Sequence, residues 1–341
     1  MTRVRFAPSP TGSLHVGNAL SAVANRAFGE WMLLRIDDTD PERNVPGGEE
    51  ALLADLDWLG IRWDEGPVRQ SERGDVYRAA AERLDAAPDP DGSLRFERTT
   101  LIRPDGTATY QLASVVDDVE FGITHVIRGN DHRPNEPLHR RLTEALGARP
   151  PEYLHHGLIL GEDGRKLSKR ARGATVAGLR EEGIPAEAVR RYLEELGLPR
   201  HDVRYDLPRI RRLAIDAISA LPDHALAERV GVPVELAPAL RGARDLDEAR
   251  EIATQILEPE PARLAEDARP TLERFRELRD RVNGSLEYEG ARALLRELKA
   301  VGGDLHALRL ALTGRDRGPE LAAVVAALPK DEALRRVDAA L

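Results

Sequence analysis

A strand, a turn, a helix and a second strand follow one another within the first 36 residues. Residues 3–7 read as a short buried strand, and residues 31–36 read as another. Between them lie a proline-rich turn at residues 8–12 and a helical spacing of Ala and Val at residues 16–28. A strand–helix–strand segment of this length is a crossover unit, so the two strands are expected to lie parallel in one sheet.

The pattern changes along the chain from mixed α/β to helical. Further helices are expected near residues 47–59, 72–86 and 135–147, and short strands at residues 124–128 and 158–160. Beyond about residue 174 the sequence is rich in Ala, Leu, Glu and Arg, with no clear strand pattern from residue 207 onward. A length of 341 residues accommodates about two domains, so we expect an α/β domain at residues 1–200 and an all-α domain at residues 201–341.

Composition excludes several classes of protein and site. The chain has no cysteine, which rules out disulfides, thiolate catalysis and a cysteine-based zinc site. No run of about 18 apolar residues occurs, and the first residues lack the apolar core of a signal peptide. We therefore expect a cytoplasmic protein with no membrane partner. The net charge of −9 argues against non-specific binding to nucleic acid, although the many arginines could still cluster on one surface.

The turn after the first predicted strand has features of a phosphate site. Two prolines stiffen it, and a helix is expected to begin close to His15. The start of a helix presents free N–H groups and the positive end of the helix dipole. Gly12 and Gly17 would let the backbone approach a ligand closely, and His15 could donate to a phosphate oxygen. An ordinary strand-to-helix turn with a surface histidine is the alternative for so short a motif.

A second candidate motif is the basic run at residues 166–170. It reads Lys-Leu-Ser-Lys-Arg and follows a glycine-rich turn at residues 161–164. Several mobile donors in one loop suit the charge that builds up on a triphosphate during displacement. Taken alone, however, this run is also typical of a solvated basic loop.

Together the two segments resemble the signature sequences of class I aminoacyl-tRNA synthetases, usually written HIGH and KMSKS. Longer stretches are similar to glutamyl-tRNA synthetases and occur in the order found in that family. They read RFAPSPTGSLHVGN, LLRIDDTDPERN, DWLGIRWDEGP, RQSERGDVYR, DGTATYQLASVVDD, GITHVIRGNDH and LILGEDGRKLSKR, all within residues 3–170. A weaker likeness returns at residues 305–321. The resemblance implies a Rossmann-like parallel-sheet catalytic domain followed by a helical domain that contacts the stem and anticodon of tRNA.

The resemblance also implies roles for residues around an ATP molecule. His15 and Asn18 would face its phosphates, while Lys166 and Lys169 would stabilise the α-phosphate and the departing pyrophosphate. The other residues expected to contact ATP are Gly17, Gly129, Asp131, Leu158 and Leu160, with the two leucines presenting backbone to adenine. Mg²⁺ would arrive with ATP, because no carboxylate cage for a metal is visible, and no zinc is expected.

For the amino acid, Arg5 and Arg128 match family positions that face the side-chain carboxylate of the substrate. A carboxylate in a dry pocket needs cationic donors, and each charge-assisted hydrogen bond contributes roughly 1.5–3 kcal/mol. Structural salt bridges are the alternative for both arginines. Tyr110 would close the pocket, and the other expected contacts are Ala7, Ser9, Asp37 and Ser114. Asp37 stands where the family usually carries a Glu for the substrate amine, and Ser114 stands where an Asn is common.

One segment of the family is nearly missing from this chain. The resemblance implies an inserted domain that binds the acceptor end of tRNA, but residues 86–103 are too few to form it. Three functions remain open. The first is a compact glutamyl-tRNA synthetase that uses ATP, glutamate and tRNA. The second is a tRNA-independent ligase that transfers the adenylate to a small amine or carrier, and the third is a catalytically silent paralogue.

Overall fold

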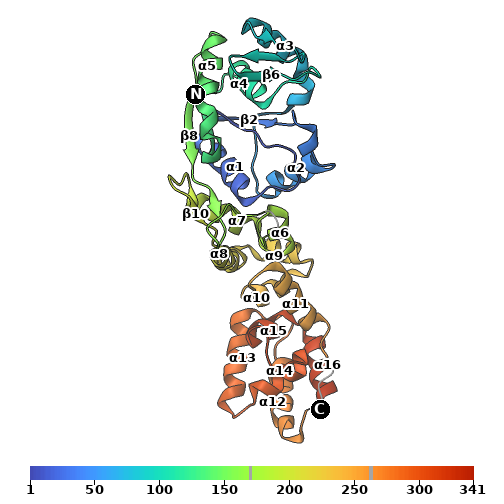
Figure 1. The fold of residues 1–341 in the computed structure, drawn as a ribbon. Coiled ribbons are helices and arrows are strands. Elements are labelled where there is room, and N and C mark those ends of the chain that lie inside the picture. Colours follow the sequence, from blue (N-terminus) through green and yellow to red (C-terminus); the bar gives the residue numbers. More distant parts are fainter. Residues whose placement is uncertain (169–170, 261–263) are drawn as a thin grey trace. The chain divides into compact units, whose positions relative to one another are not determined.

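A computed structural model describes residues 1–168, 171–260 and 264–341 of the chain (Figure 1). The chain forms two compact units. The N-terminal unit comprises residues 1–181 and 189–207, and the C-terminal unit comprises residues 182–188 and 208–341. The predicted order, a parallel-sheet α/β region followed by a helical region, is confirmed. In the described parts of the chain, no helix has both the length and the apolar character needed to cross a membrane.

The centre of the N-terminal unit is a set of parallel strands. β1 (Arg3–Phe6) pairs with β2 (Trp31–Ile36), which pairs with β3 (Glu65–Arg69). β7 (His125–Gly129) pairs in parallel with β8 (Glu152–His156). β7 also lies beside β1, where the amide of Thr124 donates to the carbonyl of Arg3 at 2.9 Å. The strand order therefore reverses between β1 and β7, and ligands of open α/β sheets bind at such a point, beyond the carboxyl ends of the strands.

Two of these strands, β3 and β8, were not predicted from the sequence. Each is the outer strand of its sheet. β3 reads Glu-Gly-Pro-Val-Arg and β8 reads Glu-Tyr-Leu-His-His, so neither shows a long apolar run or a clear alternation. Edge strands tolerate polar residues and proline because only one side of the strand must pair.

Helices and short hairpins surround the parallel strands. The helices are α1 (Val16–Phe28), α2 (Gly48–Trp58), α3 (Gly74–Arg83), α4 (Tyr110–Glu120), α5 (Glu136–Ala145), α6 (Val176–Glu181) and α7 (Ala186–Leu196). The 3₁₀ turns are η1 (Pro41–Arg43), η2 (Gln70–Arg73) and η3 (Asn130–Asn135). Two short strands, β9 (Ile159–Leu160) and β10 (Val203–Arg204), pair in parallel. The helix expected near residues 72–86 thus begins as the η2 turn and ends earlier than predicted.

The segment predicted as a nearly deleted insertion forms a small sheet of its own. β4 (Ala87–Pro88), β5 (Leu94–Phe96) and β6 (Thr99–Ile102) are antiparallel, and they lie near α3 and α4 in the teal region of Figure 1. Apolar residues of β6, α3 and α4 share one core cluster, which includes Leu101, Tyr77 and Leu112. The segment is therefore a folded element of the N-terminal unit, built of two short hairpins that share β5.

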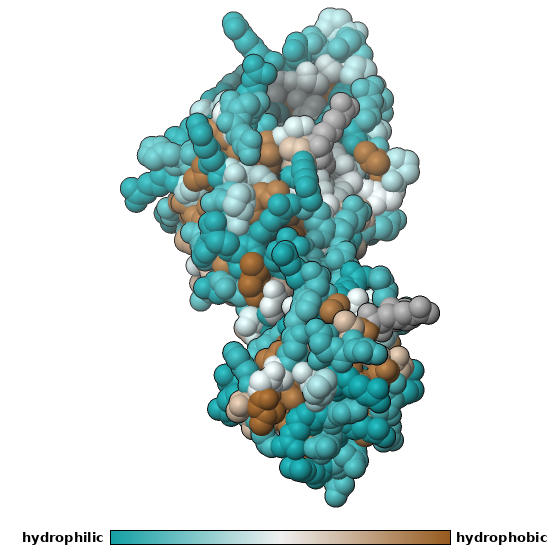
Figure 2. Space-filling model, turned by 90° about the horizontal axis from the view of Figure 1, so that it is seen from below, coloured by the Kyte–Doolittle hydropathy of each residue, from teal (hydrophilic) through white to brown (hydrophobic). Residues whose placement is uncertain are grey.

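The C-terminal unit is helical throughout its described residues. Its helices are α8 (Leu207–Ala220), α9 (Asp223–Val230), α10 (Ala237–Leu240), α11 (Leu246–Leu257), α12 (Arg269–Asp280), α13 (Tyr288–Ala300), α14 (Leu305–Thr313), α15 (Leu321–Ala327) and α16 (Lys330–Ala340), with 3₁₀ turns η4 (Val234–Leu236) and η5 (Glu266–Ala268). Leu272, Phe275 and Leu308 lie in one large apolar cluster formed by α11 to α16. The face in Figure 2 is mainly hydrophilic, and its hydrophobic patches are small and separate. Apolar residues scattered in this way are ordinary for a folded surface.

Candidate active site

A cleft of about 600 Å³ opens at the carboxyl ends of the parallel strands. Its walls include the residues that follow β1, β2, β7 and β8, as expected for the point where the strand order reverses. Most of the residues proposed from the sequence line it: Arg5, Ala7, Ser9, His15, Gly17, Asn18, Asp37, Tyr110, Arg128, Gly129, Asp131, Leu158 and Lys166. Ser114 and Leu160 do not line it, and Lys169 lies outside the described residues.

The two signature-like segments meet at this cleft. The amide of Val16 donates to the carbonyl of Ala174, and the amide of Val176 donates to the carbonyl of Leu14, both at 2.9 Å. These bonds join the start of α1 to the chain that follows the basic loop. His15 and Lys166 line the same cleft. The two segments therefore lie together, as the sequence hypothesis requires.

The turn before α1 is held firmly in place. His15 is the N-cap of α1, and its Nδ1 accepts a hydrogen bond from the amide of Gly17 at 3.1 Å. The buried carboxylate of Asp55 accepts from the hydroxyl of Ser13 at 2.6 Å and from the amide of Leu14 at 2.8 Å. Gly48 at the start of α2 lies so close to the turn that a Cβ would stand 2.3 Å from the carbonyl oxygen of Pro10. The N-terminus of α1, where anions bind favourably, is thus fixed at the cleft.

Lys166 forms an ion pair with Asp131 across the cleft edge. The distance from its Nζ to Oδ2 of Asp131 is 2.6 Å. Burial raises the pKa of Asp131, but the hydrogen bond and charge of Lys166, together with His132, outweigh burial and leave this pKa below its usual value. A Cβ at Gly129 would stand 2.7 Å from Oδ1 of Asp131, so a larger residue here would displace this carboxylate. The pair brings two predicted ATP contacts together.

Leu158 and Leu160 were predicted to present backbone groups to adenine. The amide of Leu158 donates to Oδ1 of Asp202 at 2.8 Å, and its carbonyl accepts from the amide of Val203 at 2.9 Å. The carbonyl of Leu160 likewise accepts from Tyr205 at 2.8 Å. These backbone groups are already paired inside the fold. Leu158 lines the cleft, and its side chain lies near Gly129. A ligand that binds its amide would take the place of Asp202.

Arg128 is a buried cation that forms no ion pair with a carboxylate among the residues that the structure describes. Its side chain is held by weak polar contacts, from Nη1 to the hydroxyl of Tyr110 at 3.4 Å and from Nε to Nε2 of His155 at 3.3 Å. The guanidinium also lies over the ring of Tyr153, 5.1 Å from its centroid. Its Nη2 is buried and has no hydrogen-bond partner in the described part of the chain. Since an unpaired buried charge is unfavourable, Arg128 is prepared to bind an anion from the cleft.

Histidines beside Arg128 are neutral at physiological pH. Burial and the charge of Arg128 lower the pKa of His155 to about 4 and that of His139 to about 3. Burial also lowers the pKa of His132, although Asp131 opposes this shift. These rings therefore add no positive charge to the cleft, and Arg128 and Arg5 supply the charge on this side.

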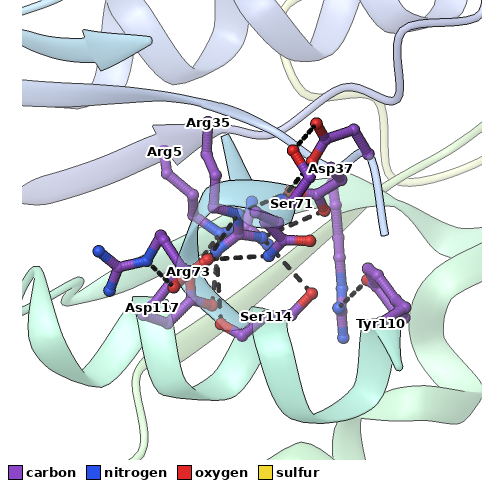
Figure 3. Close-up of polar contacts among 12 residues, drawn as sticks. Arg5, Arg35, Asp37, Ser71, Arg73, Tyr110, Ser114 and Asp117 are labelled. Atoms are coloured by element: carbon purple, nitrogen blue, oxygen red, sulfur yellow. Dashed lines mark hydrogen bonds and ion pairs between the residues drawn. The ribbon is translucent and has the colours of Figure 1, made fainter. Parts of the chain in front are cut away.

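Arg5 belongs to a buried network of charges beneath the cleft (Figure 3). Its Nε donates to Oδ1 and Oδ2 of Asp118, at 3.2 and 3.4 Å, so the salt bridge considered from the sequence is present, while Arg5 also lines the cleft. Asp37 accepts from Arg35 through both oxygens, at 2.7 and 3.2 Å. Ser114 lies below the cleft, where its carbonyl accepts from Nη1 of Arg35 at 3.3 Å.

The sequence interpretation missed Arg35 and the carboxylates that bind it, Asp117 and Asp118. A local signal existed, because residues 33, 35 and 37 alternate onto one face of a strand, and positions 114, 117 and 118 fall on one face of a helix. Nothing in the sequence showed that these two faces meet.

The arginines of this network are all paired with carboxylates. Arg5 and Arg35 bind Asp118, Arg35 also binds Asp37 and Asp117, and Arg73 binds Asp117 and Glu120. Arg128 lies outside this network. It is a buried arginine of the cleft for which no ion pair with a carboxylate is found among the described residues.

Comparison with known proteins agrees with this geometry. A family model described as "tRNA synthetases class I (E and Q), catalytic domain" matches residues 1–86 and 92–210, and a model described as "Anticodon binding domain" matches residues 224–341. The interruption at residues 87–91 falls within the segment where a reduced insertion was predicted.

Two curated relatives are similar over nearly the whole chain. Glutamate–tRNA ligase 1 of Rubrobacter xylanophilus is 37% identical, covering 99% of this chain and 97% of the relative. Glutamate–tRNA ligase of Akkermansia muciniphila is 32% identical, covering 99% of this chain and 98% of the relative. Both alignments run over 427 residues, at least 86 more than this chain of 341 contains, so the relatives carry segments that this chain lacks.

A solved structure of a glutamate tRNA ligase from Elizabethkingia meningosepticum, in complex with its amino acid, has the same fold. It superposes with a TM-score of 0.75 at 24% identity, covering 99% of each chain. The family match extends over more than half of the residues, and the relatives at 37% and 32% identity match it from end to end. The chain therefore belongs to the class I tRNA synthetases of the E and Q group.

Proposed function

We propose that this protein is a glutamate–tRNA ligase. It activates glutamate with ATP as glutamyl-adenylate and then transfers the glutamyl group to tRNA. The observation that carries this proposal is the buried, uncompensated guanidinium of Arg128 in the cleft. The names of the full-length relatives support it.

Charge distinguishes glutamate from glutamine as the substrate. A free glutamate carries an ammonium and two carboxylates, so its net charge is −1, whereas glutamine is neutral. We assign Asp37 to the ammonium and assign Arg128 and Arg5 to the side-chain carboxylate, since all three residues line the cleft. Glutamate would thus neutralise the charge of Arg128, while glutamine would leave it buried and unpaired, which is unfavourable.

The first step joins the α-carboxylate of glutamate to the α-phosphorus of ATP. The bond between the α-phosphorus and the bridging oxygen breaks, and pyrophosphate leaves. We assign His15, Asn18 and the N-terminus of α1 to the phosphates, and we assign Lys166 and Lys169 to the negative charge on the departing pyrophosphate. Mg²⁺ accompanies ATP, as is general for phosphoryl chemistry of this kind. Gly129 and Asp131 are assigned to the ribose.

In the second step, a ribose hydroxyl at the 3′ end of tRNA attacks the carbonyl carbon of the adenylate, and AMP leaves. We assign catalysis to residues 1–200 and tRNA contacts to residues 201–341. The match of residues 224–341 to an anticodon-binding domain supports the second assignment. A cytoplasmic location is part of the proposal, since tRNA charging takes place there.

A specific observation also favours a second function. The small sheet of β4 to β6 replaces what we expected as an inserted acceptor-binding domain, and at least 86 aligned positions of the relatives have no counterpart here. An enzyme that transfers the adenylate to a small amine or carrier would not need those positions.

The test is ATP–pyrophosphate exchange with purified protein and glutamate, with and without tRNA, followed by aminoacylation of total tRNA. We expect exchange driven by glutamate but not by glutamine, and formation of glutamyl-tRNA. Exchange without any aminoacyl-tRNA would support the second function instead. No exchange with any amino acid would favour a silent paralogue. In this assay Lys169→Ala should abolish exchange in a folded protein, and full activity would remove the basic loop from the mechanism.

A further inference from the structure

We propose that Arg35 is a positioning residue of the amino-acid pocket, which fixes Asp37 directly and fixes Arg5 through Asp118. Arg35 is fully buried and does not line the cleft, so it would act through these neighbours and not by touching substrate. The inference rests on the proposed function, because it assigns Asp37 to the ammonium of glutamate and Arg5 to the carboxylate.

Strand geometry brings the three groups to one face. Arg5 on β1 lies opposite Leu33 on β2, so the side chains of residues 5 and 33 point the same way. Arg35 and Asp37 follow Leu33 at intervals of two residues and share its face. α4 covers this face with Asp118, and Figure 3 shows Arg5 and Arg35 reaching from the strands toward that helix.

One carboxylate oxygen couples the two arginines. Oδ1 of Asp118 accepts from Nη1 of Arg35 at 2.9 Å and from Nε of Arg5 at 3.2 Å. Nε of Arg5 is held by Asp118 and Arg5 lines the cleft, so we expect the other two nitrogens of its guanidinium to face the cleft. The direction of a planar guanidinium determines whether it can bind a carboxylate through two donors.

The guanidinium of Arg35 also binds Asp37, on the other side of the pocket. Nε and Nη2 of Arg35 bind both oxygens of Asp37 in a fork, at 2.7 and 3.2 Å. Arg35 thus connects the acidic and the basic walls of the pocket through one rigid side chain. A change in Arg35 would disturb the positions of both walls together.

A second layer holds Arg35 from below. Oδ2 of Asp117 lies 3.6 Å from Nε of Arg35. Asp117 in turn accepts hydrogen bonds from Gln70 at 2.8 Å, from Arg73 at 2.9 Å and from Tyr77 at 3.0 Å. The network is therefore complete before any ligand binds, and such preorganised support sets how well a site fits its ligand.

The experiment measures KM for glutamate and for ATP by pyrophosphate exchange in Arg35→Lys and Asp118→Asn. Lysine keeps the charge, but one ammonium cannot reproduce the fork that reaches Asp37 and Asp118 together. We expect KM for glutamate to rise at least tenfold in each variant, with KM for ATP unchanged within twofold. The matched control is Arg26→Lys, which alters an ion pair with Asp64 in the same unit, where neither residue lines the cleft or contacts Asp37, Asp117 or Asp118. Both of its KM values should stay within twofold of wild type.

The outcomes separate this inference from the proposed function. If the wild type shows no exchange with glutamate, the proposed function fails, and this inference fails with it. If the wild type is active but Arg35→Lys, folded by circular dichroism, keeps its KM for glutamate, the inference alone is overturned. An equal rise in both KM values would mean general damage and would overturn it as well. Should Arg35→Lys not fold, the same readings apply to Asp118→Asn, which nearly preserves side-chain volume.

Discussion

Buried arginines occur in both units of this protein, but their partners differ. In the N-terminal unit, Arg5 and Arg35 bind side-chain carboxylates around the cleft. In the C-terminal unit, Nη1 of Arg336 donates to the backbone carbonyls of Ile256 and Leu312, at 2.6 and 2.7 Å, while its Nε binds the carboxylate of Glu332 at 2.6 Å. Arg279 similarly donates to the carbonyls that follow α12, those of Val282 and Gly284.

The difference teaches how to separate structural from functional arginines. Carbonyls in the last turn of a helix lack partners within that helix, and a buried arginine that reaches them stabilises the helix end. A guanidinium whose donors bind backbone carbonyls is occupied within the fold and does not depend on a ligand for its partners. Of the buried arginines in the N-terminal unit, Arg5 and Arg35 pair with carboxylates, and Arg128, which lies in the cleft, does not pair with any among the described residues.

The strongest test of this contrast is Arg128→Met. We expect KM for glutamate in pyrophosphate exchange to rise about 100-fold, or about 2.7 kcal/mol, because the substrate carboxylate loses its charge-assisted donors. The free energy of unfolding should fall little or even rise, since the buried Nη2 has no partner. The matched control is Arg140→Met. Arg140 also lies over the ring of Tyr153, but it does not line the cleft. A KM unchanged by Arg128→Met would place the carboxylate site elsewhere.

The opposite outcome is expected for Arg336→Met. Loss of its hydrogen bonds to two helix-end carbonyls should lower the free energy of unfolding of the C-terminal unit by about 2 kcal/mol, because the carbonyls are left buried and unpaired. Urea titration followed by circular dichroism measures this, and pyrophosphate exchange should be unaffected. Arg335→Met is the control, because exposed Arg335 binds the same Glu332 from the surface and should change stability by less than about 0.5 kcal/mol. If exchange fell with Arg336→Met, a purely structural role would be wrong.

Lys166, at the cleft edge, is a further residue that should affect ligand binding more than stability. Its ion pair with Asp131 is largely exposed, so Lys166→Met should change stability by less than about 1 kcal/mol. KM for ATP should nevertheless rise about tenfold, because a cation facing the phosphates is lost. Arg165→Met, one position earlier in the loop and outside the cleft lining, serves as the control. Equal effects of the two substitutions would indicate general electrostatic attraction instead of a defined contact.

The smallest expected effect concerns His139, which lies near Arg128. Burial and the charge of Arg128 lower its pKa in the folded protein to about 3, whereas the unfolded chain has a pKa of about 6.5. As pH falls from 7.5 to 6.0, the unfolded state takes up protons that the folded state does not, so stability decreases by about 0.8 kcal/mol.

Urea titrations of the wild type and His139→Gln at both pH values measure this contribution. The loss of stability between pH 7.5 and 6.0 should be smaller by about 0.8 kcal/mol in the variant. Between pH 7.5 and 9 the two proteins should respond alike, because His139 is neutral in both states there. An identical response of both proteins at pH 6.0 would show that His139 takes up a proton in the folded state.

Local patterns in the sequence predicted a large part of this structure. The strand, turn, helix and strand of residues 3–36 were found nearly as expected, and so was the helical character of the last 130 or so residues. Most of the predicted site residues line one cleft, because motif spacing specifies which residues follow the ends of parallel strands. The polar outer strands β3 and β8 were missed, since edge strands lack a strong apolar pattern.

The sequence by itself thus determined the α/β-then-helical architecture and the position of the ligand cleft, because periodicity and turn residues act over short distances. Only the tertiary structure decided which charges meet. Arg35 and Asp118 are separated by 83 residues, and their contact exists because α4 packs across the strands. Whether an arginine is neutralised or left facing a ligand depends on such long-range packing. For this reason the motifs placed Arg5 and Arg128 at the substrate but could not show that Arg5 is paired with Asp118 and that Arg128 is not.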